Sequence, residues 1–109
     1  MALALNVFQT VTHVATTGAV GIYTAPVGYT GVVLLAQAAN VGSATRTVSL
    51  SHKRSSTTTE VVKELPIEAS DTANLLPGKL VLETGDSLEV SASAGSDIKF
   101  LGSILETLN

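Results

Sequence analysis

The chain has 109 residues, a net charge of −3 and a pI near 5.1, and 45% of its residues are hydrophobic while only 14% are charged. This length fits a single domain with its own core. The absence of cysteine excludes a disulfide framework, a thiolate nucleophile and a cysteine zinc site, and the acidic balance argues against nucleic acid as the main partner.

The N-terminal segment MALALNVFQT has no positive charge and no continuous apolar run, so it does not predict a signal peptide. No apolar run approaches the ~20 residues of a membrane span. We therefore expect synthesis in the cytoplasm and no membrane partner. The charge content is low against the usual ~25%, which favours a surface covered by neighbouring subunits; a monomer with a neutral Ser/Thr surface is the alternative.

The first half of the chain alternates in the manner of β-strands. In the segment Leu3 to Val14, Leu3, Leu5 and Val7 share one face and Phe8 falls on the other. This change of phase indicates either a bulge or a strand whose faces meet different partners. A short strand follows at 19–24, before the Pro26-Val27-Gly28 turn.

The most apolar strand is predicted for Thr30 to Asn40. It is apolar on both faces, whereas a strand in a single sandwich needs only one apolar face. We therefore expect its second face to lie in a subunit interface. The interface predicted from this strand and the N-terminal strand comprises Leu3, Leu5, Val7, Phe8, Val33, Leu35 and Ala39.

The second half continues the alternation, with strands expected at 45–52, 57–66 and 97–108 and an irregular connection at 68–76. Between them, the segment Leu75 to Ser93 predicts a β-hairpin whose arms meet at Thr84-Gly85-Asp86. Its buried face is expected to hold four apolar residues, namely Leu80, Leu82, Leu88 and Val90.

About eight strands separated by turn signals every ~8–12 residues predict an all-β fold. We expect an antiparallel β-sandwich, either jelly-roll-like or Ig-like. The expected organisation is one domain, with an N-terminal strand or arm at 1–18 and the sandwich at 19–109.

The residues give no sign of catalysis, a metal site or a cofactor. His13 and His52 are the only histidines and lack nearby ligands, whereas zinc needs three or four. Asp86 is better explained as a turn cap than as a calcium ligand. No serine stands in a nucleophile elbow, and the glycines form no phosphate loop.

Two weaker features define a candidate binding surface. Tyr23 and Tyr29 flank the Pro-Gly turn and form either a ligand platform or packing at the core edge, with the hydroxyl bonded to backbone. Lys53 and Arg54 lie in the basic tip of an expected hairpin, which either contacts phosphate, pairs with an acidic neighbour or is solvated.

Several segments in order carry a resemblance to a known group. A strand ending in Tyr-x-Ala-Pro-x-Gly-x-Thr, here Tyr23 to Thr30, precedes an apolar strand ending in Ala39-Asn40. The segment LLPGKLVLETGDSLEV, Leu75 to Val90, and a final strand ending in Leu-Glu-x-Leu, Leu105 to Leu108, follow. Together they resemble small virion structural proteins of tailed bacteriophages, over most of the chain from about Val20.

The resemblance implies a non-enzymatic β-sandwich on a phage particle, in the decoration, neck or tail accessory class. We expect a capsid decoration or cement protein that forms a homo-oligomer, with a trimer as the guess, and that contacts other virion proteins such as the major capsid protein. The alternatives are a neck, tail or baseplate accessory protein, or a receptor- or carbohydrate-binding module on a phage appendage.

Overall fold

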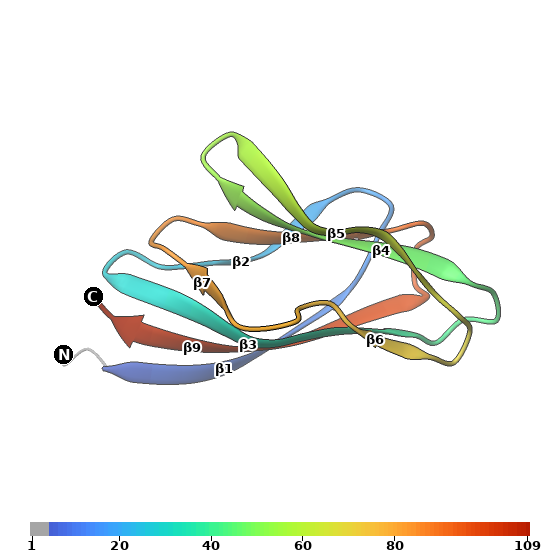
Figure 1. The fold of residues 1–109 in the computed structure, drawn as a ribbon, viewed down its shortest axis with the longest axis horizontal. Coiled ribbons are helices and arrows are strands. Elements are labelled where there is room, and N and C mark those ends of the chain that lie inside the picture. Colours follow the sequence, from blue (N-terminus) through green and yellow to red (C-terminus); the bar gives the residue numbers. More distant parts are fainter. Residues whose placement is uncertain (1–4) are drawn as a thin grey trace.

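The computed structural model describes residues 5–109 as an all-β fold of nine strands in two antiparallel sheets. Figure 1 shows the two sheets packed face to face in an elongated body of 47 × 26 × 24 Å. The strands are β1 (Asn6–Val14), β2 (Val20–Thr24), β3 (Tyr29–Asn40), β4 (Arg46–Arg54), β5 (Thr57–Ile67), β6 (Thr72–Asn74), β7 (Leu80–Leu82), β8 (Ser87–Ala92) and β9 (Ile98–Leu108).

The strand order identifies the fold as a jelly roll. Sheet A has the order β1-β9-β3-β6, with β7 pairing on the same side of β3 as β6, and sheet B has the order β2-β8-β4-β5. If β6 and β7 are counted as one interrupted strand, each sheet has four positions, and successive strands lie in opposite sheets except for the β4–β5 hairpin, in the order that two Greek keys produce. This order confirms the predicted sandwich and selects the jelly-roll form over the Ig form.

The core lies between the sheets, where alternate side chains of each strand point inward. The largest fully buried apolar side chains are those of Leu50, Leu75, Leu82, Leu88, Ile98, Ile104, Val33, Val48 and Val90. Asn40 is also buried, and its amide Nδ2 donates to the carbonyls of Ala44 and Ile67 while its Oδ1 accepts from the Gly42 N–H. A polar residue is stable there because its side-chain bonds are satisfied.

The expected hairpin at Leu75 to Ser93 is wrong in its pairing. β7 pairs with β3 in sheet A, whereas β8 pairs with β2 and β4 in sheet B. The segment 83–86 is therefore a corner at which the chain passes from one sheet to the other (Figure 1). Alternation shows only that each strand has one buried face. The two arms of a corner bury their apolar residues in the same core as the two arms of a hairpin would, so the sequence pattern is the same for both.

The face assignment within this segment was nevertheless largely right. Leu82, Leu88 and Val90 are buried, and Leu80 is half-buried against the core. Val81, between the two leucines of β7, is 53% exposed.

We expect Leu82→Ala and Leu88→Ala each to lower the free energy of unfolding by about 2–4 kcal/mol, because each deletes a fully buried side chain and leaves a cavity. Urea denaturation monitored by circular dichroism measures the loss. Val81→Ala is the matched control on the same segment and should change the unfolding free energy by less than ~0.5 kcal/mol. Equal losses in all three variants would contradict the assigned faces.

Candidate functional site

An apolar row crosses the outer face of sheet A. The pairing register places Phe8 opposite Leu105, Leu105 opposite Val32, and Val32 opposite Val81. These four side chains come from four strands and lie side by side on the face that points away from the core. Phe8 is 74% exposed at one end of the row, and Val81 is exposed at the other.

The outer face of sheet B has the opposite character. Its register pairs Lys53 with Ser87, Ser51 with Glu89, and Ser49 with Ser91. The residues of β8 alternate with buried ones, and Ser49 and Ser51 of β4 flank buried Leu50. One outer face is thus polar and suited to water, whereas the other exposes apolar side chains in a contiguous row, as interaction surfaces do.

A β-bulge explains why Val33, Leu35 and Ala39 of β3 do not share one face, as the sequence predicts. The register of β3 against β9 shifts between Val33 and Leu35, leaving Leu34 as the extra residue. Gly31 and Val33 point inward before the bulge, and Ala36, Ala38 and Asn40 point inward after it. The outward set is Val32, Leu35, Gln37 and Ala39, so the face changes phase in mid-strand.

The structure distributes the predicted interface residues over three environments. Phe8, Leu35 and Ala39 lie on the outer face of sheet A, as the register with β9 shows. Val33 is wholly buried in the core, so its place in an interface is wrong; the bulge beyond it reverses the expected phase.

The remaining predicted interface residues belong to the N-terminal segment. Leu5 is exposed, and its carbonyl accepts from the Leu108 N–H. Val7 lies opposite buried Glu106 and therefore on the inner side. Leu3 lies outside the described residues. Much of the expected arm at 1–18 forms β1, which pairs along its whole length with β9.

A groove of about 580 Å³ lies on the same face of sheet A. Thr10, Ser103 and Leu35 separate it from the apolar row. Its outward-facing walls come from Thr12 and Val14 of β1, Leu101 and Lys99 of β9, and Gln37 and Ala39 of β3. The groove is mostly apolar, with Lys99 as the charged residue in its lining.

A cluster of charged side chains around the buried Asp86 carboxylate fixes the corner between β7 and β8. The Asp86 side chain is 2% exposed and accepts from Arg54 Nε at 2.8 Å and Arg54 Nη2 at 2.7 Å. The same carboxylate lies 3.0 Å from His52 Nε2 and accepts from the Glu83 N–H at 2.9 Å. The hydrogen bonds from Arg54, together with those from His52 and the Glu83 N–H, hold the pKa of Asp86 well below its usual range.

The four residues of the predicted binding surface all have interactions within the chain. Lys53 Nζ lies 3.6 Å from Glu89, and Arg54 bonds both Asp86 and Glu83. The Tyr23 hydroxyl donates to Glu106 Oε2 at 2.6 Å, and burial with this neighbouring carboxylate raises the pKa of Tyr23. Tyr29 is half-buried, and its carbonyl accepts from the Thr84 hydroxyl.

Of the three alternatives for the basic hairpin tip, pairing with an acidic neighbour is the one that the structure shows for Lys53 and Arg54. The Tyr23 hydroxyl reaches a carboxylate instead of a backbone group. Asp86 does cap its turn through the Glu83 N–H, yet its main partner is Arg54, 32 residues away in sequence. No local signal could have identified that partner.

Within residues 5–109, no three His, Asp or Glu side chains converge as a metal site would require. The same residues include no helix long and apolar enough to cross a membrane.

Known structures resemble this fold at low sequence identity. A chain in the acidic stable capsid structure of Helicobacter pylori bacteriophage KHP30 is 12% identical, with 96% of this chain and 89% of that chain covered and a TM-score of 0.57. A chain of the Bacillus endospore appendages, which form disulfide-linked pili, is 14% identical, with 100% and 97% covered and a TM-score of 0.53. At these identities the likeness shows the fold alone. No family model and no curated protein matches the sequence.

We expect Asp86→Asn to lower the unfolding free energy by about 2 kcal/mol at pH 7, because neutral asparagine weakens charge-assisted bonds to Arg54. The folded-state pKa of Asp86 is depressed, so its contribution is complete above the unfolded pKa of ~4 and is lost as the pH falls toward the folded value. Urea unfolding from pH 7 to pH 2 should show a flatter acid decline for Asp86→Asn than for the wild type. Parallel declines would contradict this account.

Tyr23→Phe removes the hydroxyl that donates to buried Glu106 and should cost about 1–3 kcal/mol of unfolding free energy. A double-mutant cycle with Glu106→Gln tests whether this bond causes the loss. The expected coupling is at least ~0.5 kcal/mol, whereas strictly additive losses would show that the ring packing, and not the bond, is responsible.

Proposed function

We propose that this protein is a non-enzymatic structural protein of a phage virion, and specifically a capsid decoration protein that docks through the outer face of sheet A. The observation that carries the proposal is the apolar row Phe8, Leu105, Val32 and Val81 on that face. The jelly roll, which recurs in viral capsid proteins, and the likeness to a chain of a phage capsid structure support it.

The size of the face is consistent with docking. The strands β1, β9, β3, β6 and β7 have 9, 11, 12, 3 and 3 residues, and at ~4.8 Å between strands and ~3.3 Å per residue they cover roughly 600 Å². A standard interface buries ~800 Å² per partner, so this face and part of its rim would supply one side. Its apolar centre and polar surroundings match the usual anatomy of such contacts.

The proposed partner is another virion protein, such as the major capsid protein. The neck, tail or baseplate position uses the same surface and differs only in location. Receptor or carbohydrate binding through Tyr23, Tyr29, Lys53 and Arg54 has less support. The side chains of Tyr23, Lys53 and Arg54 already pair within the chain, with Glu106, Glu89 and Asp86 respectively.

Location in the particle tests the proposal. Particles assembled without this protein should have heads that open at a lower temperature or lower osmotic stress, and adding the purified protein should restore head stability. Heads of normal stability, with loss of tails or of adsorption to cells, would overturn the decoration assignment. Binding of the isolated protein to a glycan array would favour the receptor-binding alternative.

We expect Leu35→Asp to abolish or weaken particle binding while changing monomer stability little, because Leu35 lies on the outer face and a charge there must be desolvated on docking. Ser91→Asp, on the outer face of sheet B, is the matched control and should bind as the wild type does. Co-sedimentation with depleted particles measures binding, and thermal unfolding measures stability. Equal loss of stability and binding in Leu35→Asp would place Leu35 in the monomer core.

A further inference from the structure

One edge of sheet A presents an open row of backbone groups. Within residues 5–109, β1 pairs only with β9. The Leu5 carbonyl accepts from the Leu108 N–H, and the Ala15 N–H donates to the Ile98 carbonyl, so the odd-numbered residues of this segment face β9. Successive residues of a strand direct their backbone groups to opposite sides. The free edge is therefore formed by the N–H and C=O groups of Asn6, Phe8, Thr10, Thr12 and Val14.

The other edges carry features that oppose pairing. β5 has two register shifts against β4, and it contains Pro66 and the charged residues Glu60, Lys63 and Glu64. β2 is short and has its own register shift, while β6 and β7 have three residues each. Bulges, charges, proline and shortness are the usual protections of an edge strand. β1 has none of them: it is nine residues long, regular, uncharged and free of proline.

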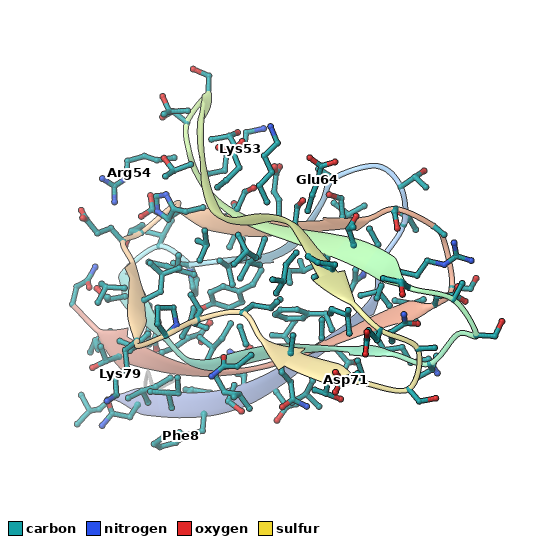
Figure 2. All side chains as sticks on the ribbon, turned by 45° about the vertical axis from the view of Figure 1, so that its right-hand side comes forward. Phe8, Lys53, Arg54, Glu64, Asp71 and Lys79 are labelled. Atoms are coloured by element: carbon teal, nitrogen blue, oxygen red, sulfur yellow. The ribbon has the colours of Figure 1, made fainter. Side chains whose placement is uncertain are left out.

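The outer face beside this edge offers a projection and a recess. Figure 2 shows Phe8 projecting from β1 away from the body of the molecule. Further along the same strand, Thr12 and Val14 form one wall of the groove. Leu101 of β9, which lies opposite Thr12, also lines the groove. The projecting Phe8 side chain and the groove wall at Thr12 and Val14 belong to the same face of β1, so this one strand supplies both a side chain that can insert and a groove that can receive it.

We propose that β1 pairs antiparallel with β1 of a second copy about a twofold axis at Thr10, joining two copies of sheet A into one continuous sheet. Thr10 is the middle residue of β1, so this register uses all nine residues. Phe8 of each copy then lies opposite Thr12 of the other and packs into its groove. The inference goes beyond the proposed function, which concerns docking to another virion protein, and names a contact between two copies of this chain.

A second copy fits this edge for reasons of symmetry and charge. An antiparallel pair is isologous, so the contact is satisfied on both sides by the same residues. β1 carries no charged side chain that would face its own copy, whereas like charges directly opposite destabilise a strand pair. The Phe8 contact with the groove is also formed twice, once from each copy to the other. This arrangement gives a dimer in place of the trimer expected from sequence.

Cysteine cross-linking tests the pairing and its register, because the chain has no cysteine of its own. Residues paired at the axis have Cα atoms ~5.5 Å apart, within disulfide range. Thr10→Cys should therefore form a disulfide-linked dimer on mild oxidation. Thr12→Cys is the matched control, since two copies of residue 12 would be ~14 Å apart, beyond disulfide range. Linking by both variants, by Thr12→Cys alone, or by neither would overturn the proposal.

Equilibrium sedimentation of the full chain provides the second measurement. The wild type should sediment as a dimer, and Thr10→Pro should raise its dissociation constant about 30-fold or more, because the lost N–H faces the free edge. Phe8→Ser should also weaken the dimer, whereas Val81→Ser, at the far end of the apolar row, should not. A trimer, a monomer, or equal effects of the two serine variants would count against the pairing.

The outcomes separate this contact from the proposed function. A protein that binds heads but shows no Thr10→Cys link refutes only the strand pairing. A protein that dimerises as described but is absent from heads refutes only the decoration role.

Discussion

The Asp86 carboxylate is the constraint on which the corner between the sheets depends. Its bonds from Arg54 and the Glu83 N–H tie the end of β4 to the segment that leaves β7. The backbone of the same corner pairs with Ala25, whose N–H donates to the Asp86 carbonyl and whose carbonyl accepts from the Gly85 N–H. A buried charge is tolerated only where such partners surround it, so the crossing from sheet A to sheet B has one well-defined geometry.

Because the chain crosses from sheet A to sheet B at this corner, the outer faces of the two sheets differ in polarity. β8 lies in sheet B with Ser87, Glu89 and Ser91 outward, which makes that face polar. β7 lies in sheet A and extends the apolar row by Val81. Had both arms paired with each other, Val81 would have joined the polar face of the same sheet. The asymmetry that defines the candidate docking face therefore follows from the corner.

The sequence predicted what depends on local pattern. Strand positions, the buried Leu82, Leu88 and Val90, and the sandwich class all follow from period-two alternation and turn residues. Pairing could not be predicted, because alternation does not say which strand lies alongside. For this reason the segment Leu75 to Ser93 predicts a hairpin, whereas it forms a corner between the two sheets. The bulge at Leu34 also has no local signature. It changes the phase of β3, so that Val33 lies in the core although Leu35 lies on the outer face. Of the candidate site, Phe8 and Leu35 were predicted, whereas the partner Leu105 depends on strand order.

The distribution of edge protection limits how this subunit can grow. A free edge that accepted any strand would add copies without end, and heterologous contacts that do not close produce filaments. Here the opposite edge of sheet A is formed by β6 and β7, which have only three residues each, so a continuous sheet could not extend from both sides of sheet A. The long edge of sheet B at β5 is protected by charge, bulges and Pro66. A twofold contact at β1 would use, in both copies, the one long edge that lacks such protection among residues 5–109. In the proposed dimer, Phe8 and the groove are used between the copies, whereas Leu105, Val32 and Val81 of each outer face remain available for a different partner.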